Sequence, residues 1–106
     1  MQDMSTVERA MELMLKYNPK ICILQCTSAY PTPLDCVNLK VMETYRKSFP
    51  NSPVGYSGHE LGFAVSLAAA ALGANVIERH FTLDNSLKGN DHKCSLNPKE
   101  FKCVFL

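Results

Sequence analysis

Residues 53–82 constrain the fold more than any other stretch, because they have the pattern of a strand, a helix and a second strand. The first strand is predicted in residues 54–56 and the second in residues 75–80. Between them, apolar side chains recur at helical spacing, which predicts one buried helix face. These side chains are Leu61, Val65, Ala68 and Leu72. Gly73 is placed to end the helix, because glycine adopts the left-handed conformation of a C-terminal cap without steric cost.

This arrangement predicts where two histidines lie. Strands joined by a helix in this way are parallel, with a right-handed crossover. Ligands of parallel α/β folds bind beyond the carboxyl ends of the strands. His59 follows the first predicted strand and His80 ends the second. We therefore expect both imidazoles at one edge of the sheet, where they could share a metal ion. The alternative is two hydrogen-bonded histidines near strand ends.

Two helices are predicted before this unit. Residues 6–17 carry an apolar face, and Ser5 with Glu8 fits a capping box at their start. Residues 36–48 carry another apolar stripe, with Asp35 as the expected cap.

A third strand and a last helix complete the pattern. Residues 21–26 are nearly all apolar, which is typical of a strand buried on both faces in a parallel sheet. Asn97 and Glu100 fit a capping box that begins a helix with Pro98 in its first turn. Three parallel strands cannot close a barrel and leave two unpaired edges. We therefore expect this α/β chain to be part of a domain.

Composition excludes several classes of function. The 106 residues carry a formal net charge of +1 without a basic stripe, so we expect no nucleic-acid partner. No apolar run approaches the length of a membrane span, and the polar start does not resemble a signal peptide. The 5 cysteines are an odd number without a C-x-x-C pair. Together with the absence of a recognisable secretory signal, this favours reduced thiols and a cytoplasmic location.

Four stretches resemble the N-acetylneuraminate (sialic acid) synthase family, nearer to its animal members. They are residues 24–31 (LQCTSAYP), 55–60 (GYSGHE), 78–82 (ERHFT) and 88–92 (KGNDH). They follow the order and spacing of the family from about Met1 to Lys99. The resemblance implies a TIM (β/α)8 barrel, of which residues 1–106 would be the C-terminal portion, with the last three βα units and parallel strands.

The resemblance also implies an activity. The family condenses phosphoenolpyruvate with N-acetylmannosamine, or in animals its 6-phosphate, and releases phosphate. The product is N-acetylneuraminate or its 9-phosphate. The reaction uses a divalent metal, and imidazole with oxygen ligands suits Mn²⁺ best, with Mg²⁺ or Co²⁺ as alternatives. Intact members of the family are homodimers.

Seven positions match functional positions of the family. His59 and His80 match the metal-binding histidines. Glu78 and Asp91 match catalytic groups that hold or polarise the amino sugar, and Tyr30 matches a residue that binds it.

Two serines match the phosphoenolpyruvate site. Ser57 matches a serine on the phosphate or carboxylate of that substrate. Ser28 falls where some bacterial members have an asparagine for the same ligand.

Purely structural roles are the alternatives for these residues. Glu78 and Arg79 could form a neighbouring charged pair, and Ser57 could cap the following helix. Tyr30 could cover apolar surface with its hydroxyl in water. Asp91 could be a solvated loop residue.

The chain also departs from the family pattern. The resemblance does not extend to the first five strands, which supply a lysine, a glutamate and serines of the phosphoenolpyruvate site, or to the C-terminal antifreeze-like domain. That domain lends an arginine to the neighbouring subunit. We therefore expect no turnover by this chain alone. One alternative is a truncated, non-catalytic binding or interaction product, and another is a zinc module built from His92, Cys94 and Cys103.

Overall fold

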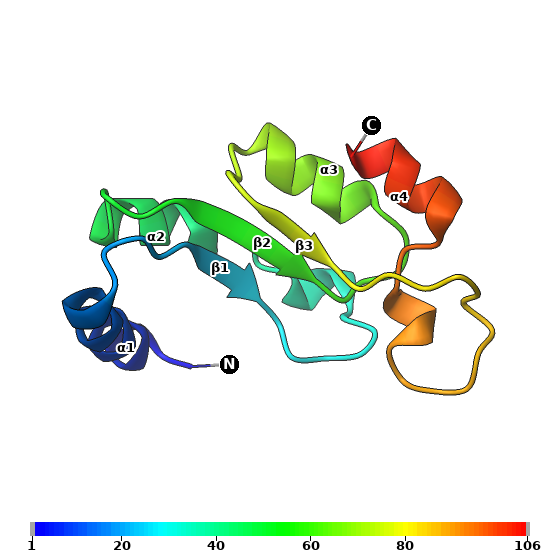
Figure 1. The fold of residues 1–106 in the computed structure, drawn as a ribbon, viewed down its shortest axis with the longest axis horizontal. Helices are drawn as coiled ribbons and strands as arrows, with labels where there is room; N and C mark the ends of the chain where they lie inside the picture. The colour runs from blue at the N-terminus through cyan, green and yellow to red at the C-terminus, as the bar shows by residue number, and fades with distance from the viewer. Residues whose placement is uncertain (1, 106) are drawn as a thin grey trace.

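A parallel sheet of three strands forms the centre of the protein. The computed structural model describes residues 2–105. The strands are β1 (Ile23–Cys26), β2 (Val54–Gly58) and β3 (Ile77–Arg79), in the order β1-β2-β3. Both neighbouring pairs are parallel, and Figure 1 shows the three strands running in one direction with β2 in the middle. The predicted α/β class and the parallel strands are confirmed.

In the described part of the chain, four helices accompany the sheet, together with two short 3-10 segments. The helices are α1 (Met4–Tyr17), α2 (Val41–Ser48), α3 (Ala64–Ala71) and α4 (Pro98–Phe105). The 3-10 segments are η1 (Leu34–Cys36) and η2 (His92–Cys94). Helices α2 and α3 pack on β2, and α3 also contacts β3. Within residues 2–105, no helix combines the length and apolar character that a membrane crossing requires.

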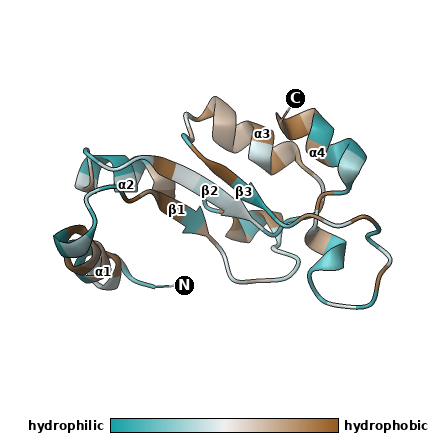
Figure 2. Cartoon of the chain, viewed as in Figure 1, coloured by the Kyte–Doolittle hydropathy of each residue, from teal (hydrophilic) through white to brown (hydrophobic). Residues whose placement is uncertain are grey.

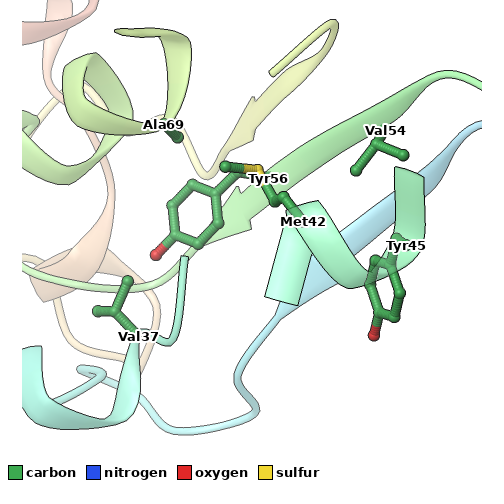
Figure 3. Packing of buried hydrophobic residues seen from close by; sticks show 6 residues of the cluster. All are labelled: Val37, Met42, Tyr45, Val54, Tyr56 and Ala69. Atoms are coloured by element: carbon green, nitrogen blue, oxygen red, sulfur yellow. The ribbon is translucent and has the colours of Figure 1, made fainter. Parts of the chain in front are cut away.

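The core lies between β2 and the helices α2 and α3. Its buried members are Val37, Met42, Tyr45, Val54, Tyr56 and Ala69. Figure 3 shows the Tyr56 ring in the centre of this cluster, beside Met42. Because side chains alternate along a strand, Val54 and Tyr56 point to the helices while Gly55 and Ser57 face the opposite side of the sheet. The opposite side carries the Ser57 hydroxyl, which hydrogen-bonds to Glu78 of β3.

The start of α1 differs from the prediction. The helix begins at Met4, and its cap is Asp3, whose Oδ1 accepts a hydrogen bond of 2.8 Å from the backbone N–H of Thr6. Ser5 was predicted as the cap, which is wrong, because it lies inside the first turn and donates to the Asp3 carboxylate at 3.0 Å. The helix therefore begins two residues earlier than a Ser5 cap would place it, and the Asp3 carboxylate satisfies an N–H of the first turn.

The second helix also begins later than predicted. The predicted helix 36–48 is replaced by η1 and then α2, with a break at Asn38, whose φ is +53°. Asparagine is one of the few residues that enters the left-handed region readily. Asp35 was predicted as the cap of the helix, which is wrong, because Asp35 lies within η1 and the residue before α2 is Lys40.

The predicted buried face of the third helix is partly wrong. Leu61 lies before α3 and is 63% exposed, and Leu72 at its end is 54% exposed. The buried residues of α3 are Ser66 and Ala69. Figure 2 shows α3 in apolar colours over nearly its whole length, so apolar spacing alone could not select the packed side.

Two predicted helix ends are confirmed. Gly73 has φ of +82° and donates to the carbonyl of Ala70 at 2.9 Å, as expected of a C-terminal cap. Asn97 begins α4 with a reciprocal capping box. Its Oδ1 accepts from the N–H of Glu100 at 3.1 Å, and the Glu100 carboxylate accepts from the N–H of Asn97 at 3.0 Å.

Candidate functional site at the carboxyl edge of the sheet

Two histidines meet at the carboxyl edge of the sheet. His59 follows the last residue of β2, and His80 follows the last residue of β3. Their ring centroids are 5.1 Å apart and the ring planes are inclined by 73°. The prediction that neighbouring parallel strands bring both imidazoles to one edge is confirmed.

The surroundings of His59 determine its tautomer. Its Nδ1 lies 3.1 Å from the carbonyl oxygen of Thr27, in the loop after β1. A carbonyl oxygen can only accept, so Nδ1 is the donor, and in the neutral ring Nε2 is then the nitrogen with the lone pair. A neutral imidazole whose other nitrogen donates to a carbonyl is the usual arrangement of a metal-binding histidine.

His80 has a carboxylate on its Nδ1 side. Asp91 Oδ2 lies 3.9 Å from His80 Nδ1, within ion-pair distance but longer than a hydrogen bond. The two side chains are 39% and 60% exposed, so water screens the attraction. Asp91 thus lies where it could orient the His80 ring, although its side chain remains largely solvated.

The donor set fits a divalent metal. Imidazole–metal bonds are about 2.1 Å long, so two rings whose centroids are 5.1 Å apart can share one ion. Among residues 2–105, no group of three or more His, Cys, Asp and Glu side chains surrounds one point. The protein would therefore supply two nitrogen ligands, and oxygen ligands from water or substrate would complete the coordination.

The alternative of a zinc module is wrong. His92 Nδ1 lies 2.8 Å from the hydroxyl of Thr82, and the buried Cys94 thiol donates to the carbonyl of Asp91 at 3.3 Å. Cys103 is exposed on α4. The three side chains form no metal-binding group among the described residues.

Tyr30 packs against both histidines, tilted over the His59 ring and edge-on to the His80 ring. Its ring centroid lies 4.2 Å from that of His59 and 6.2 Å from that of His80. Thr32 holds this loop in place, because its backbone N–H donates to the carbonyl of His59 at 2.9 Å. The Thr32 hydroxyl also donates to the carbonyl of Ala29 at 2.8 Å. Tyr30 thus covers an imidazole with its ring, while the residue as a whole remains 46% exposed.

Ser57 and Glu78 form a contact between neighbouring strands. They are direct partners in the register of β2 and β3, and the Ser57 hydroxyl donates to Glu78 Oε1 at 2.7 Å. Ser57 lies inside β2 and does not cap α3, so the alternative role as a helix cap is wrong. Ser57 and Glu78 share one side of the sheet, and His59 and His80 follow two positions later on each chain segment, just past the strand ends.

Ser28 lies apart from this contact. It is exposed in the loop after β1 and lines a cavity with Leu24 and Cys26 of that strand.

The sequence analysis missed a buried ion pair beside the histidines. Arg79 Nη1 lies 2.7 Å from Glu60 Oε1, and both side chains are 0% exposed. Arg79 was considered as a charged neighbour of Glu78, which is wrong, because its guanidinium points to the helix side and binds Glu60. The sequence signal was the direct succession of His59 and Glu60, and of Arg79 and His80, at two strand ends.

Further contacts complete this buried cluster. The Tyr56 hydroxyl donates to Glu60 Oε2 at 2.7 Å. Burial, then the Glu60 hydrogen bond and charge, raise the pKa of Tyr56 well above its usual range. Arg79 also donates to the Ser66 hydroxyl at 2.9 Å and to the carbonyl of Cys94 at 3.0 Å. The cluster thus joins β2, β3, α3 and η2 directly behind the histidines.

Fold and site together define an α/β protein with a polar, histidine-bearing site at the carboxyl ends of parallel strands. The chain matches the NeuB family over residues 1–105, and it belongs to that family.

Several relatives with known names are similar to the chain. It is 54% identical to human N-acetylneuraminate-9-phosphate synthase, covering 94% of this chain and 28% of the relative. It is 47% identical to the N,N'-diacetyllegionaminic acid synthase of Campylobacter jejuni, covering 98% of this chain and 32% of the relative. The chain therefore spans about a third or less of these relatives.

Solved structures show the same fold. The N-acetylneuraminic acid synthetase of Leptospira borgpetersenii superposes with a TM-score of 0.91 at 34% identity, covering 97% of this chain and 36% of that protein. A spore coat polysaccharide biosynthesis protein of Bacillus subtilis gives a TM-score of 0.87 at 36% identity, covering 96% of this chain and 29% of that protein.

Proposed function

We propose that the chain is the C-terminal portion of the catalytic TIM barrel of a sialic acid synthase. The intact enzyme would condense phosphoenolpyruvate with N-acetylmannosamine or its 6-phosphate. The observation that carries this proposal is the 5.1 Å separation of the His59 and His80 rings at the carboxyl edge of the sheet. Family membership supports it, and the names of the human, mouse and Drosophila relatives, N-acetylneuraminate-9-phosphate synthases, favour the phosphorylated sugar.

His59 and His80 would hold the divalent metal through their Nε2 atoms, with Mn²⁺ as the preferred ion and Mg²⁺ or Co²⁺ as alternatives. When bound, the metal supplies a Lewis acid that polarises the sugar aldehyde. Thr27 and Asp91, on the Nδ1 sides of the two rings, would keep both imidazoles in the orientation that binding needs.

The neighbouring polar residues would bind the two substrates. Glu78 and Asp91 would hold and polarise the open-chain amino sugar, and Tyr30 would pack against it. Ser57, and Ser28 from the adjoining loop, would bind phosphoenolpyruvate. The Ser57 hydroxyl donates to Glu78 at 2.7 Å, which orients that carboxylate on the histidine side of the sheet.

The proposed reaction forms one carbon–carbon bond. The enol carbon of phosphoenolpyruvate attacks the sugar aldehyde, and the aldehyde oxygen takes up a proton. Water adds to the neighbouring carbon of the former enol and loses a proton. The bond between this carbon and the oxygen of the phosphate group then breaks, which leaves the keto acid and inorganic phosphate. The site would lower the activation barrier by holding both substrates and the Glu78 carboxylate in the orientation that the reaction requires.

A second candidate is a non-catalytic product of the same family that binds ligand or a partner subunit. The short length of the matched region favours this second candidate, because the chain spans only 28% of the human relative. We further propose that the intact enzyme is a homodimer. A cytoplasmic setting is also proposed, because the described cysteines are all free thiols.

Titration of the chain with Mn²⁺ tests the proposal. Paramagnetic broadening of the imidazole signals of His59 and His80 is expected, and His59→Ala or His80→Ala should abolish it. His92→Ala is the matched control, because His92 binds Thr82 outside the pair. Binding that survives loss of both His59 and His80 would overturn the metal site.

A product assay with phosphoenolpyruvate and either sugar separates the two candidates. Turnover by this chain alone would exclude the non-catalytic product. A folded chain that binds Mn²⁺ and both substrates without forming keto acid would support it.

A further inference from the structure

A cavity of about 540 Å³ opens between the loops that follow β1 and β3. Tyr30 and Pro31 of the first loop form one side, and Ser86, Lys88, Asn90 and Lys93 of the second loop contribute to the other. Its volume lies within the range of about 300–1,000 Å³ that small-molecule sites occupy. The cavity thus lies at the edge of the sheet that carries the histidine pair.

The wall of this cavity is positively charged. Lys88 and Lys93 both line it, and its lining residues include no carboxylate. Within residues 2–105, neither lysine takes part in an ion pair of the chain. The two nearest acidic residues of the loop have other partners. Asp84 accepts from the N–H of Ser86 at 2.8 Å and Asp91 lies beside His80.

Tyr30 connects the cavity to the histidine pair. Its ring forms part of the cavity wall and also stacks on His59 at a centroid distance of 4.2 Å. A ligand whose carbonyl group lies at the histidines could therefore pass along Tyr30 and place its other end between the lysines. An open-chain sugar phosphate has this form, with the aldehyde at one end and the phosphate ester at the other.

We infer that Lys88 and Lys93 form a subsite for the phosphate monoester of the phosphorylated sugar. Lysine ammonium groups bind phosphate as mobile point charges. The subsite would make the enzyme prefer N-acetylmannosamine 6-phosphate to the free sugar, so it depends on the proposed function. Because phosphoenolpyruvate is also a phosphate monoester, the test must separate the two sources of phosphate.

Binding to the whole chain in the presence of Mn²⁺ tests this subsite. In NMR titrations, N-acetylmannosamine 6-phosphate should shift the signals of Lys88 and Lys93, and N-acetylmannosamine should not. Lys88→Ala/Lys93→Ala should weaken binding of the phosphosugar by about tenfold or more, to the level of the free sugar. Mn²⁺ broadening of His59 and His80 should stay unchanged in that variant.

Lys99→Ala/Lys102→Ala is the matched control, because it removes two lysines of α4 outside the cavity lining. It should leave phosphosugar affinity unaltered. Equal affinity for the two sugars, or no shift at either cavity lysine, would overturn the subsite. If Lys88→Ala/Lys93→Ala weakened binding of phosphoenolpyruvate and not of the phosphosugar, the lysines would belong to the other substrate, which would also overturn the subsite. If the unmodified chain did not bind Mn²⁺, that result would instead contradict the proposed function.

Discussion

Arg79 Nη1 lies 2.7 Å from Glu60 Oε1, and neither side chain has any exposed surface. Glu60 directly follows His59, and Arg79 directly precedes His80. The ion pair therefore ties together the two strand ends that carry the candidate metal ligands. Arg79 Nη1 also donates to the Ser66 hydroxyl and to the Gly62 carbonyl. These bonds pair guanidinium N–H groups that would be costly to bury alone.

Arg79→Met should strongly destabilise the protein, because it leaves the Glu60 carboxylate buried without its partner. We expect a loss of about 3–5 kcal/mol in the free energy of unfolding, measured with urea. Mn²⁺ affinity should also fall, although Arg79 is not a proposed ligand, since the spacing of the two histidines depends on the pair.

Lys47→Met is the control for this prediction. Lys47 forms an ion pair of 2.8 Å with Glu43 in which both side chains are largely exposed. Its removal should cost no more than about 1 kcal/mol. Equal losses for the two variants would show that burial of the Arg79 pair has no special effect on stability.

The tautomer of His59 gives a second prediction. Because Nδ1 lies 3.1 Å from the Thr27 carbonyl, we expect the neutral ring to carry its proton on Nδ1 and its lone pair on Nε2. Long-range ¹⁵N–¹H correlation spectra of the imidazole distinguish the two tautomers. A proton on Nε2 of the metal-free protein would contradict the orientation on which the metal site depends.

The raised pKa of the Tyr56 hydroxyl leads us to expect a loss of stability in alkali. Burial and the Glu60 hydrogen bond raise the folded-state pKa of Tyr56 above its unfolded value of about 10. The associated stability is therefore complete below about pH 10 and is lost as the pH rises further. The free energy of unfolding should fall above that pH, and Tyr56→Phe should reduce the slope.

Tyr17→Phe serves as the comparison, because Tyr17 is 84% exposed. It should leave the alkaline slope unchanged. An equal slope in the Tyr56→Phe protein and the unmodified chain would rule out this linkage.

The capping box of α4 gives a fourth prediction. Asn97→Ala removes the acceptor for the N–H groups of Lys99 and Glu100, whose bonds measure 3.0 and 3.1 Å. We expect a local loss of about 0.5–2 kcal/mol. Faster amide exchange at the start of α4 would report it, while Asn51→Ala, in the exposed turn before β2, should have no such effect. Unchanged exchange in Asn97→Ala would count against the cap.

Much of the fold could be predicted because its signals are local. The apolar run before Cys26 predicted β1, and Gly73 and Asn97 predicted two helix ends, since a cap involves residues only a few positions apart. The positions of His59 and His80 followed from parallel strands, whose carboxyl ends must share an edge. The family resemblance, which the NeuB match confirms, rested on short motifs in the same places.

The cap of α1 is also local, but two neighbouring residues fitted it, and the structure has Asp3 where Ser5 was predicted. Other features were decided only by tertiary packing. In the apolar helix α3, contact with β2 selected the side of Ala69, which residue spacing could not distinguish from the side of Leu72.

The sequence by itself determined which residues reach the edge of the sheet, because strand order and side-chain alternation follow from the local pattern. Only the tertiary structure decided that Arg79 binds Glu60, 19 positions away, and not its neighbour Glu78. The physical reason is that burial requires a charge to find its partner, and the lateral register of two strands determines which charge lies within reach.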